Sequence, residues 1–245
     1  MTMDDTAIAA LIADLDHHDK PTIRAAVDAL VPLAEHSPEL CALLYGRLNR
    51  DEQKNDWPIA YVLGQLPRPA KAVVRTLFDA LDHQEADIRW AMALLLVRIA
   101  KQDGDLVSRL IELSATGTVK QKRMALYCLR DLALSDGASL SALINALNDP
   151  DPTVRVTATI CLKLRPDISE AGKTLLLKSY LGDIDPRVRN AAAIALANLG
   201  SPSEDFLIAL RERSNSQNRE SKKTAEVALQ ILGKRRSASA ENESR

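Results

Sequence analysis

The sequence predicts an all-α protein, a right-handed α-solenoid of about seven repeats with two helices each. One position, which we call the basic slot, recurs at intervals of 32 to 34 residues: Arg24, Asp56, Arg89, Lys122, Arg155, Arg189 and Lys222. Seven positions after the slot stand Val31, Leu63, Leu96, Leu129, Leu162, Leu196 and Leu229. Twelve before it stand Ile12, Leu44, Leu77, Leu110, Leu143, Leu177 and Leu210. Large aliphatic residues at a fixed period of this size indicate stacked units that bury their apolar faces against each other.

Each unit is predicted to be a first helix, a short turn and a second helix, and the second unit departs most from this pattern. Asp56 occupies its basic slot and Pro58 falls in the first turn of its second helix. We therefore expect the second helix of that unit to be short or displaced.

The fifth and sixth units show the pattern most clearly. The fifth begins with the amphipathic spacing of Leu140, Leu143, Ile144 and Leu147. A break at 148–152 follows, in which Asp151 is placed to cap the second helix and Pro152 to occupy its first turn. The sixth unit repeats this arrangement with Asp183, Asp185 and Pro186. Alanine three residues after the slot, where the two helices of a unit approach closely, occurs at Ala125, Ala158, Ala192 and Ala225.

These turns carry a family resemblance. The segments 151–155 and 185–189 resemble the Asp-Pro-x-Val-Arg signature of HEAT repeats. Units of about 33 residues are shorter than the usual HEAT length of about 40 to 47 and are similar to compact bacterial HEAT-like repeats, including the phycobilisome lyase group. We predict a single repeat array over residues 1–234 and a disordered polar tail over 235–245.

Composition limits the classes of partner. The net charge is −1, so nucleic acid is not favoured as a partner and no membrane attachment is expected. The charge is uneven, since the first 19 residues hold five Asp and no Lys or Arg, whereas 211–236 hold eight Lys or Arg and three Glu. Three cysteines without metal-type spacing, and a start without a leader pattern, predict a reduced cytoplasmic protein.

No pattern indicates catalysis. The four histidines fall at predicted helix ends or turns, no His-Glu dipeptide occurs, and the glycines form no phosphate-binding loop. The Asp pairs 149/151 and 183/185 are interpreted as turn and cap residues rather than metal ligands. We therefore expect no catalytic residue, no metal and no cofactor.

The predicted partner-binding surface comes from placing the second helices on a helical wheel. Positions 1, 5 and 8 after the slot lie opposite the core, and aromatic residues gather there in the second to fourth units. The predicted site is Trp57, Tyr61, Trp90, Leu94, Arg123, Tyr127 and Arg130, and the expected basic rim adds Arg68, Lys101 and Lys163. Position 5 is apolar in most units, so packing between repeats is the alternative explanation of this stripe.

The function predicted from this surface is that of a non-catalytic scaffold or adaptor whose concave groove binds a peptide or helix of a partner protein. The basic rim favours an acidic partner. One alternative is a tetrapyrrole lyase or chaperone, since an aromatic groove beside Arg123 and Arg130 could receive propionates. Another is a HEAT-like DNA glycosylase, but such enzymes place a catalytic Asp one helical turn after the tryptophan, where this chain has Tyr61 and Leu94.

Overall fold

The computed structural model describes residues 5–48, 56–134, 136–200 and 202–243, and the chain divides into two compact units, Met1–Leu106 and Val107–Arg245. The first unit holds α1 (Asp5–Asp14), α2 (Lys20–Ala34), α3 (Pro38–Leu48), α4 (Trp57–Gly64), α5 (Lys71–Asp79) with the 3-10 turn η1 (Ala80–Asp82), and α6 (Ala86–Ala100). The unit boundary falls at the start of α7 (Asp105–Thr116). The second unit continues with α8 (Val119–Leu132), α9 (Gly137–Asn145) with η2 (Ala146–Asn148), α10 (Pro152–Leu162), α11 (Glu170–Gly182), α12 (Pro186–Leu199), α13 (Glu204–Ser214) and α14 (Arg219–Glu243).

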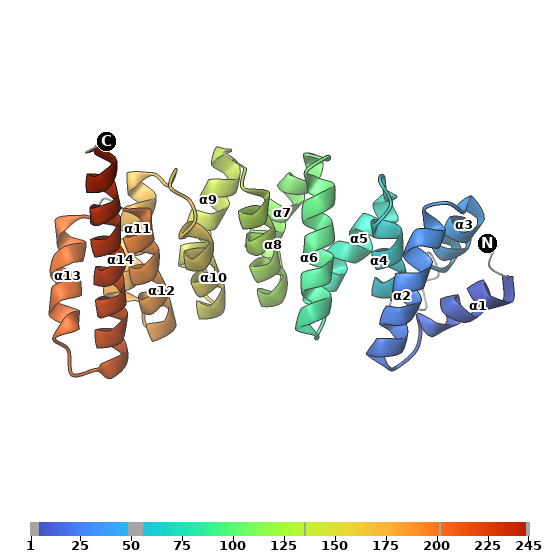
Figure 1. Ribbon diagram of the computed structural model, residues 1–245, viewed down its shortest axis with the longest axis horizontal. Helices are drawn as coiled ribbons and strands as arrows, with labels where there is room; N and C mark the ends of the chain where they lie inside the picture. The colour runs from blue at the N-terminus through green and yellow to red at the C-terminus, as the bar shows by residue number, and fades with distance from the viewer. Residues whose placement is uncertain (1–4, 49–55, 135, 201, 244–245) are drawn as a thin grey trace. The chain divides into compact units, whose positions relative to one another are not determined.

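These helices are the seven predicted pairs, and the all-α solenoid class is confirmed. Each odd-numbered helix is the first of a repeat and each even-numbered helix the second (Figure 1). Within the first unit α2 contacts α4, and α4 contacts α6; within the second, α8, α10, α12 and α14 contact one another in succession. Among the helices of the described residues, none combines the length and apolar composition that a bilayer crossing requires.

The periodic aliphatic residues form the core. Leu44, Leu77, Leu110, Leu143 and Leu210 are completely buried, as are Leu63, Leu96, Leu129 and Leu162 on the second helices. The four small residues at Ala125, Ala158, Ala192 and Ala225 are also buried, as close helix approach requires. Ile12, Val31, Leu177 and Leu229 are only half-buried.

Capping residues begin the second helices where the sequence predicted. Asp151 accepts a hydrogen bond from Thr153 N at 2.7 Å, and Asp185 accepts one from Arg187 N at 2.8 Å. Each is followed by proline at the start of its helix, where the missing N–H costs nothing. Gly200 ends α12 with φ 73° and ψ −173°, a conformation open in practice only to glycine.

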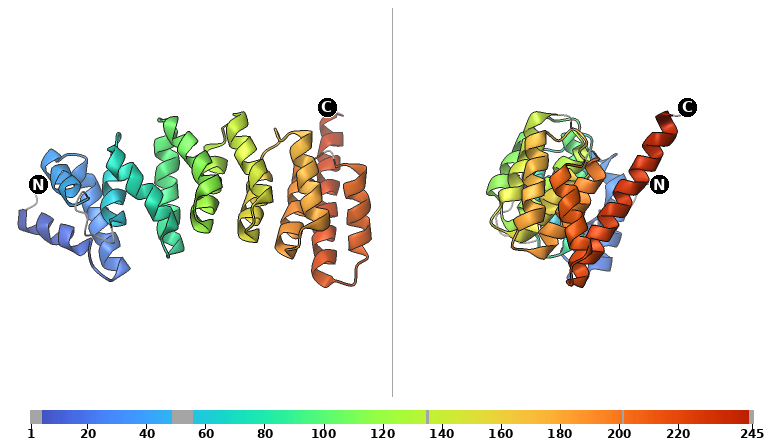
Figure 2. Two further views of the ribbon diagram at one scale, coloured as in Figure 1. Left: turned by 180° about the vertical axis from the view of Figure 1, so that it is seen from behind. Right: turned by 90° about the vertical axis from the view of Figure 1, so that its left-hand side faces the viewer.

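The C-terminal region differs from the predicted disordered tail. α14 continues as one helix to Glu243 (Figure 2), while residues 244 and 245 of that tail lie outside the described residues. Low apolar content suggested disorder, but adding turns to a helix that already packs on α12 and α13 avoids the cost of nucleation. The chain divides into two compact units, each a stack of helix pairs, and the single array over 1–234 stays a prediction.

The three cysteines are free thiols, and two of them belong to the core. Cys128 and Cys161 lie on successive second helices, α8 and α10, and the Cys161 Sγ lies 3.5 Å from the Leu126 carbonyl oxygen. Burial raises the pKa of each of these two thiols to about 12, so neither is a reactive thiolate near neutral pH.

Candidate functional site

The basic slots of the fourth to sixth repeats are structural. Lys122 Nζ binds Asp149 Oδ2 at 2.8 Å, which connects the fourth repeat to the turn of the fifth. Arg155 repeats the connection to the sixth, with Nε and Nη2 each 2.8 Å from the two oxygens of Asp183. Arg155 also donates to the Asp149 carbonyl at 2.9 Å, and Arg189 donates to the Asp183 carbonyl at 2.6 Å. These side chains tie successive turns together and leave few donors for a partner.

The paired aspartates of these turns are occupied in the same way. Asp149 and Asp183 each accept a hydrogen bond at 2.9 Å from the backbone N–H two residues on. The hydrogen bond from Arg187 holds the pKa of Asp185 at about 2, well below its usual range. Across the described residues, no group of three or more His, Cys, Asp or Glu side chains is arranged to hold a metal ion.

The first unit departs from this pattern at its second repeat, as predicted. α4 is eight residues long and begins one residue after the slot residue Asp56. By contrast, α2 begins at Lys20, four residues before Arg24, and α6 begins at Ala86, three before Arg89. Within the described residues, α4 is therefore the shortest of the three second helices of the first unit, with eight residues against fifteen in α2 and fifteen in α6.

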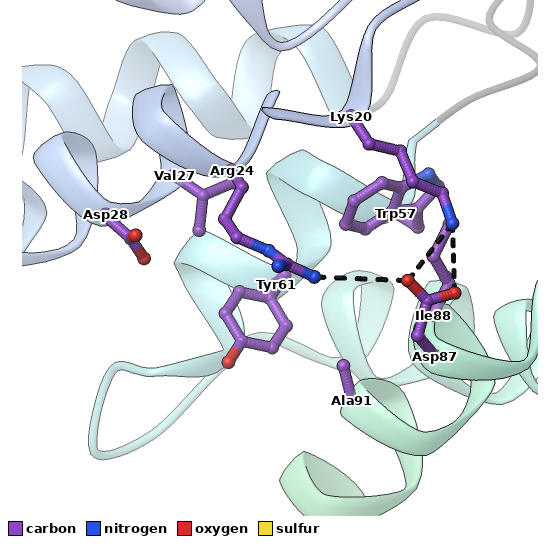
Figure 3. Close-up of a pocket in the computed structure, with 9 residues that line it drawn as sticks. All are labelled: Lys20, Arg24, Val27, Asp28, Trp57, Tyr61, Asp87, Ile88 and Ala91. Atoms are coloured by element: carbon purple, nitrogen blue, oxygen red, sulfur yellow. Dashed lines mark hydrogen bonds and ion pairs between the residues drawn. The ribbon is translucent and has the colours of Figure 1, made fainter. Parts of the chain in front are cut away.

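A pocket lies beside this shortened helix. Its volume is about 190 Å³, and its lining comes from the three second helices of the first unit: Lys20, Arg24, Val27 and Asp28 of α2, Trp57 and Tyr61 of α4, and Asp87, Ile88 and Ala91 of α6 (Figure 3). Val27, Ile88 and Ala91 are the aliphatic residues of the lining. The charged side chains lie around them.

Two cations and two carboxylates line the pocket, and they are unequally paired. Lys20 Nζ lies 3.0 Å from both carboxylate oxygens of Asp87 and also forms an ion pair with Glu85. The hydrogen bond from Lys20 lowers the pKa of Asp87. Arg24 Nη2 is 3.9 Å from Asp87 Oδ2, and its side chain is 74% exposed. Lys20 is therefore the main counter-ion of Asp87, and Arg24 is held only weakly.

Trp57 is oriented by the turn that precedes α6. Its ring meets the His83 ring edge to face, with centroids 6.4 Å apart and an interplanar angle of 67°. His83 Nδ1 accepts a hydrogen bond from the Glu85 N–H at 3.1 Å. His83 stands six residues before the basic slot, as Asp149 and Asp183 do in the second unit, and those aspartates accept the equivalent backbone hydrogen bond. The indole is half-buried, with one side against this turn and another in the pocket wall.

The predicted site residues of the first unit separate into two groups. Trp57 and Tyr61 line the pocket. Trp90 and Leu94 do not, although they are 37% and 61% exposed on α6. The wheel was wrong at position 8, where Gly64 and Val97 are buried. A Cβ on Gly64 would lie 3.2 Å from Leu95 Cδ1, because a second helix in a stack is covered by its neighbour as well as by its own first helix.

The predicted residues of the second unit are engaged within the protein. Arg130 stacks over the Tyr127 ring at 4.8 Å and binds Asp131 Oδ1 through Nε at 2.7 Å. Arg123 Nε donates to Thr157 Oγ1 at 3.2 Å. The half-buried Arg123 and Arg130 are therefore weak candidates for a basic rim. Tyr127 belongs to a different unit from Trp57, so a groove common to both stays a prediction.

Sequence reasoning missed Lys20, Asp28 and Asp87, and it treated Arg24 only as a repeat marker. Lys20 and Asp87 are 67 positions apart and belong to the first and third repeats. A helical wheel, which compares positions on one helix, contains no signal for that pairing. The sequence did hold one signal for a site in this region: the second repeat departs from the common pattern, with Asp56 at its basic slot and Pro58 two residues later.

Comparison with known proteins supports the repeat assignment. Residues 140–230 match the family model of HEAT repeats, which confirms the resemblance seen in the Asp-Pro-x-Val-Arg segments. Kap121p is similar in structure, with 16% identity and a TM-score of 0.62 over 92% of this chain and 29% of Kap121p. The structure of Kap121p bound to Ste12p is similar too, with 15% identity, a TM-score of 0.61 and the same coverage of both chains. This chain thus spans less than a third of Kap121p.

Other comparisons contribute less. Human deoxyhypusine hydroxylase matches with 18% identity over 94% of this chain and 86% of the hydroxylase, but its TM-score of 0.43 is too low to support an argument. The comparison with curated proteins gives no match. The similarities therefore establish a helical repeat fold.

Proposed function

We propose that this protein is a non-catalytic interaction scaffold and that its first unit binds a partner protein through the pocket between α2, α4 and α6. The observation that carries the proposal is the pairing of Trp57 and Tyr61 in a pocket beside the shortened helix of the array. Aromatic residues in pockets, with arginine nearby, dominate the binding energy of many protein interfaces. A rigid indole braced by His83 provides such an anchor at little entropic cost.

The size of the pocket favours a protein side chain as its occupant. Small-molecule and cofactor sites usually enclose about 300 to 1,000 Å³. At about 190 Å³ this pocket is smaller, and it matches one large apolar side chain better than a tetrapyrrole. The tetrapyrrole alternative therefore receives no support from the pocket.

The chemistry of the lining also favours binding over catalysis. Asp87 is held by Lys20, which stabilises its charged form and makes it a weak base. Two bases and two acids give the lining no net charge, which does not suit a phosphate backbone. Kap121p, a structurally similar repeat protein, has been seen bound to Ste12p, so this fold is compatible with a protein partner.

Affinity capture with the whole protein tests this proposal. We expect wild type and Trp90→Ala to retain the same partner, and Trp57→Ala and Ala91→Phe to lose it. Ala91→Phe fills the pocket without removing an aromatic anchor, so it guards against a Trp57→Ala variant that is merely destabilised. Circular dichroism melts of each variant check folding. Loss of the partner in Trp90→Ala, with retention in Ala91→Phe, would move the site to the exposed stripe of α6.

A further inference from the structure

We infer that the partner segment carries one carboxylate beside the apolar side chain that enters the pocket, and that Arg24 binds this carboxylate. The inference rests on the proposed function of the pocket and specifies the chemistry of the partner. It moves the preference for an acidic partner from Arg123 and Arg130, which are engaged within the second unit, to a residue of the first unit.

Arg24 differs from the other arginines at the basic slot in having unused donors. Arg89 donates to the carbonyls of His83 and Gln84 at 2.6 and 2.8 Å, and Arg155 and Arg189 bind turn carbonyls in the same manner. Within the described part of the chain, the Arg24 guanidinium has only its 3.9 Å ion pair with Asp87. An exposed planar guanidinium with free donors suits bidentate binding of a carboxylate.

When Arg24 is released from Asp87, that carboxylate keeps its contacts with Lys20, which it shares with Glu85. Lys20 Nζ contacts both Asp87 oxygens at 3.0 Å, and this contact is the main cause of the lowered pKa of Asp87. A partner carboxylate can therefore bind Arg24 while Asp87 keeps both of its 3.0 Å contacts with Lys20. Binding therefore does not require the rupture of a strong internal ion pair, since the Arg24–Asp87 distance is 3.9 Å.

Arg24 places a positive charge at the lining of the apolar pocket. Its side chain extends past Tyr61 toward Asp87 (Figure 3), and it lines the same pocket as the apolar Val27 and Ala91. A carboxylate bound there belongs to the residue next to the one whose side chain enters the pocket.

Asp28 limits the number of acidic residues that the site accepts. It lies one helical turn after Arg24 and lines the same pocket, and it has no ion-pair partner among the described residues. A run of acidic residues would bring a second negative charge close to Asp28, which opposes binding. The site thus fits a single acidic residue beside a leucine, isoleucine or aromatic residue.

Selection of peptides from a random display library tests the inference without a known partner. The whole protein is used as wild type, Arg24→Gln and Arg24→Lys, with Ala91→Phe as counter-selection to remove peptides that bind elsewhere. Arg75→Gln is the matched control, since Arg75 is an exposed arginine on α5 of the same unit. Fluorescence anisotropy of the selected peptides then measures affinity at low and high salt.

We expect wild type, Arg75→Gln and, more weakly, Arg24→Lys to select an acidic residue next to an apolar one. Arg24→Gln should select the apolar residue without the acidic bias. A selected acidic peptide should bind Arg24→Gln about two- to five-fold more weakly than wild type, a difference that closes at high salt because the ion pair is exposed. An apolar preference that is the same in wild type and Arg24→Gln would overturn the role of Arg24 and leave the pocket function standing. If no selected peptide depends on the open pocket, both proposals are wrong.

Discussion

Neighbouring residues on one helix have different roles in this fold. On α6, Leu96 is completely buried, whereas Trp90 is 37% exposed and Leu94 is 61% exposed. In the turns, Arg155 and Asp183 join two repeats through a pair of 2.8 Å hydrogen bonds, whereas Arg24 has a single long ion pair. These differences determine which substitutions affect folding and which affect binding.

Truncation of Leu96 should destabilise the protein more than truncation of Trp90. Leu96→Ala leaves a cavity in a closely packed core and should cost about 2 to 5 kcal/mol of unfolding free energy. Trp90→Ala removes a side chain that is already partly in water and should cost about 1 kcal/mol or less. Urea denaturation of the two variants measures both values. If Trp90→Ala were the more damaging, the assignment of α6 faces would be wrong.

The Arg155–Asp183 pair should make stability fall at low pH. Burial, the largest single effect, would raise the pKa of Asp183, but the hydrogen bonds from Arg155 and from the Asp185 N–H, together with the charge of Arg155, outweigh burial and lower the pKa. A lowered folded-state pKa means that the stabilisation is complete above the unfolded value of about 3.9 and is lost as pH falls through the folded value. Asp183→Asn should therefore be clearly less stable than wild type at neutral pH, by about 3 kcal/mol, because the arginine of a mostly buried pair loses its charged partner.

This difference should shrink as wild-type Asp183 becomes protonated below about pH 4. Urea denaturation at neutral and acidic pH measures the change. Asp79→Asn, at an exposed position on α5, is the control and should have little effect at either pH. An Asp183→Asn deficit of constant size down to the lowest pH would show that the ion pair is not its cause.

The repeats differ from one another mainly at the ends of their helices. Proline after an aspartate cap begins α10 and α12, and the pocket lies beside the short helix α4. The C-cap of α8 is unusual, because Ala133 has φ 49° and ψ 34°, a left-handed conformation in which a Cβ is strained. Glycine is the usual residue at such a position.

Ala133→Gly should therefore stabilise the protein. Relief of the left-handed strain, about 1 to 2 kcal/mol, exceeds the entropic cost of glycine, so we expect a net gain of about 0.5 to 1 kcal/mol. Ala25→Gly, at an exposed position within α2, should instead destabilise by about 1 kcal/mol. Thermal melts of both variants check the opposite signs. Equal destabilisation by the two substitutions would contradict the strain argument.

At the scale of the whole molecule, charge is distributed unevenly between the first and last repeats. In the first repeat, Asp16 is paired with Arg47 and Asp19 caps α2, while Asp4 lies outside the described residues. The last repeat exposes more unpaired charge. None of its exposed bases forms an ion pair with a described carboxylate: Arg211, Arg219, Lys222, Lys223, Lys234 and Arg235.

We expect these charges to maintain solubility rather than to drive head-to-tail association. Repeat arrays need polar terminal repeats, and two of the acids at the beginning of the chain are already engaged. Light scattering should therefore give the mass of one chain at both low and high salt. A mass that rises at low salt and returns to that of one chain at high salt would instead show association through the charged ends, because salt screens exposed charges.

The sequence by itself determined the repeat architecture of this protein. The aliphatic residues at fixed distances from the basic slot, the Asp-Pro caps and the departure at Asp56 all predicted features that the structure shows. Each of these signals lies within about one repeat of the chain. Helix periodicity and capping are local properties, so they can be predicted from neighbouring residues.

The tertiary structure alone decided which exposed residues form the pocket. Trp57 and Trp90 occupy the same position in their repeats, yet Trp57 lines the pocket and Trp90 does not. Gly64 and Val97, predicted to be exposed, are buried by packing within the stack. The physical reason is that the pocket is bounded by side chains from three helices, and its Lys20–Asp87 pair joins residues 67 positions apart. The periodicity of a single helix does not show which neighbouring helices pack against it or which of its side chains stay exposed.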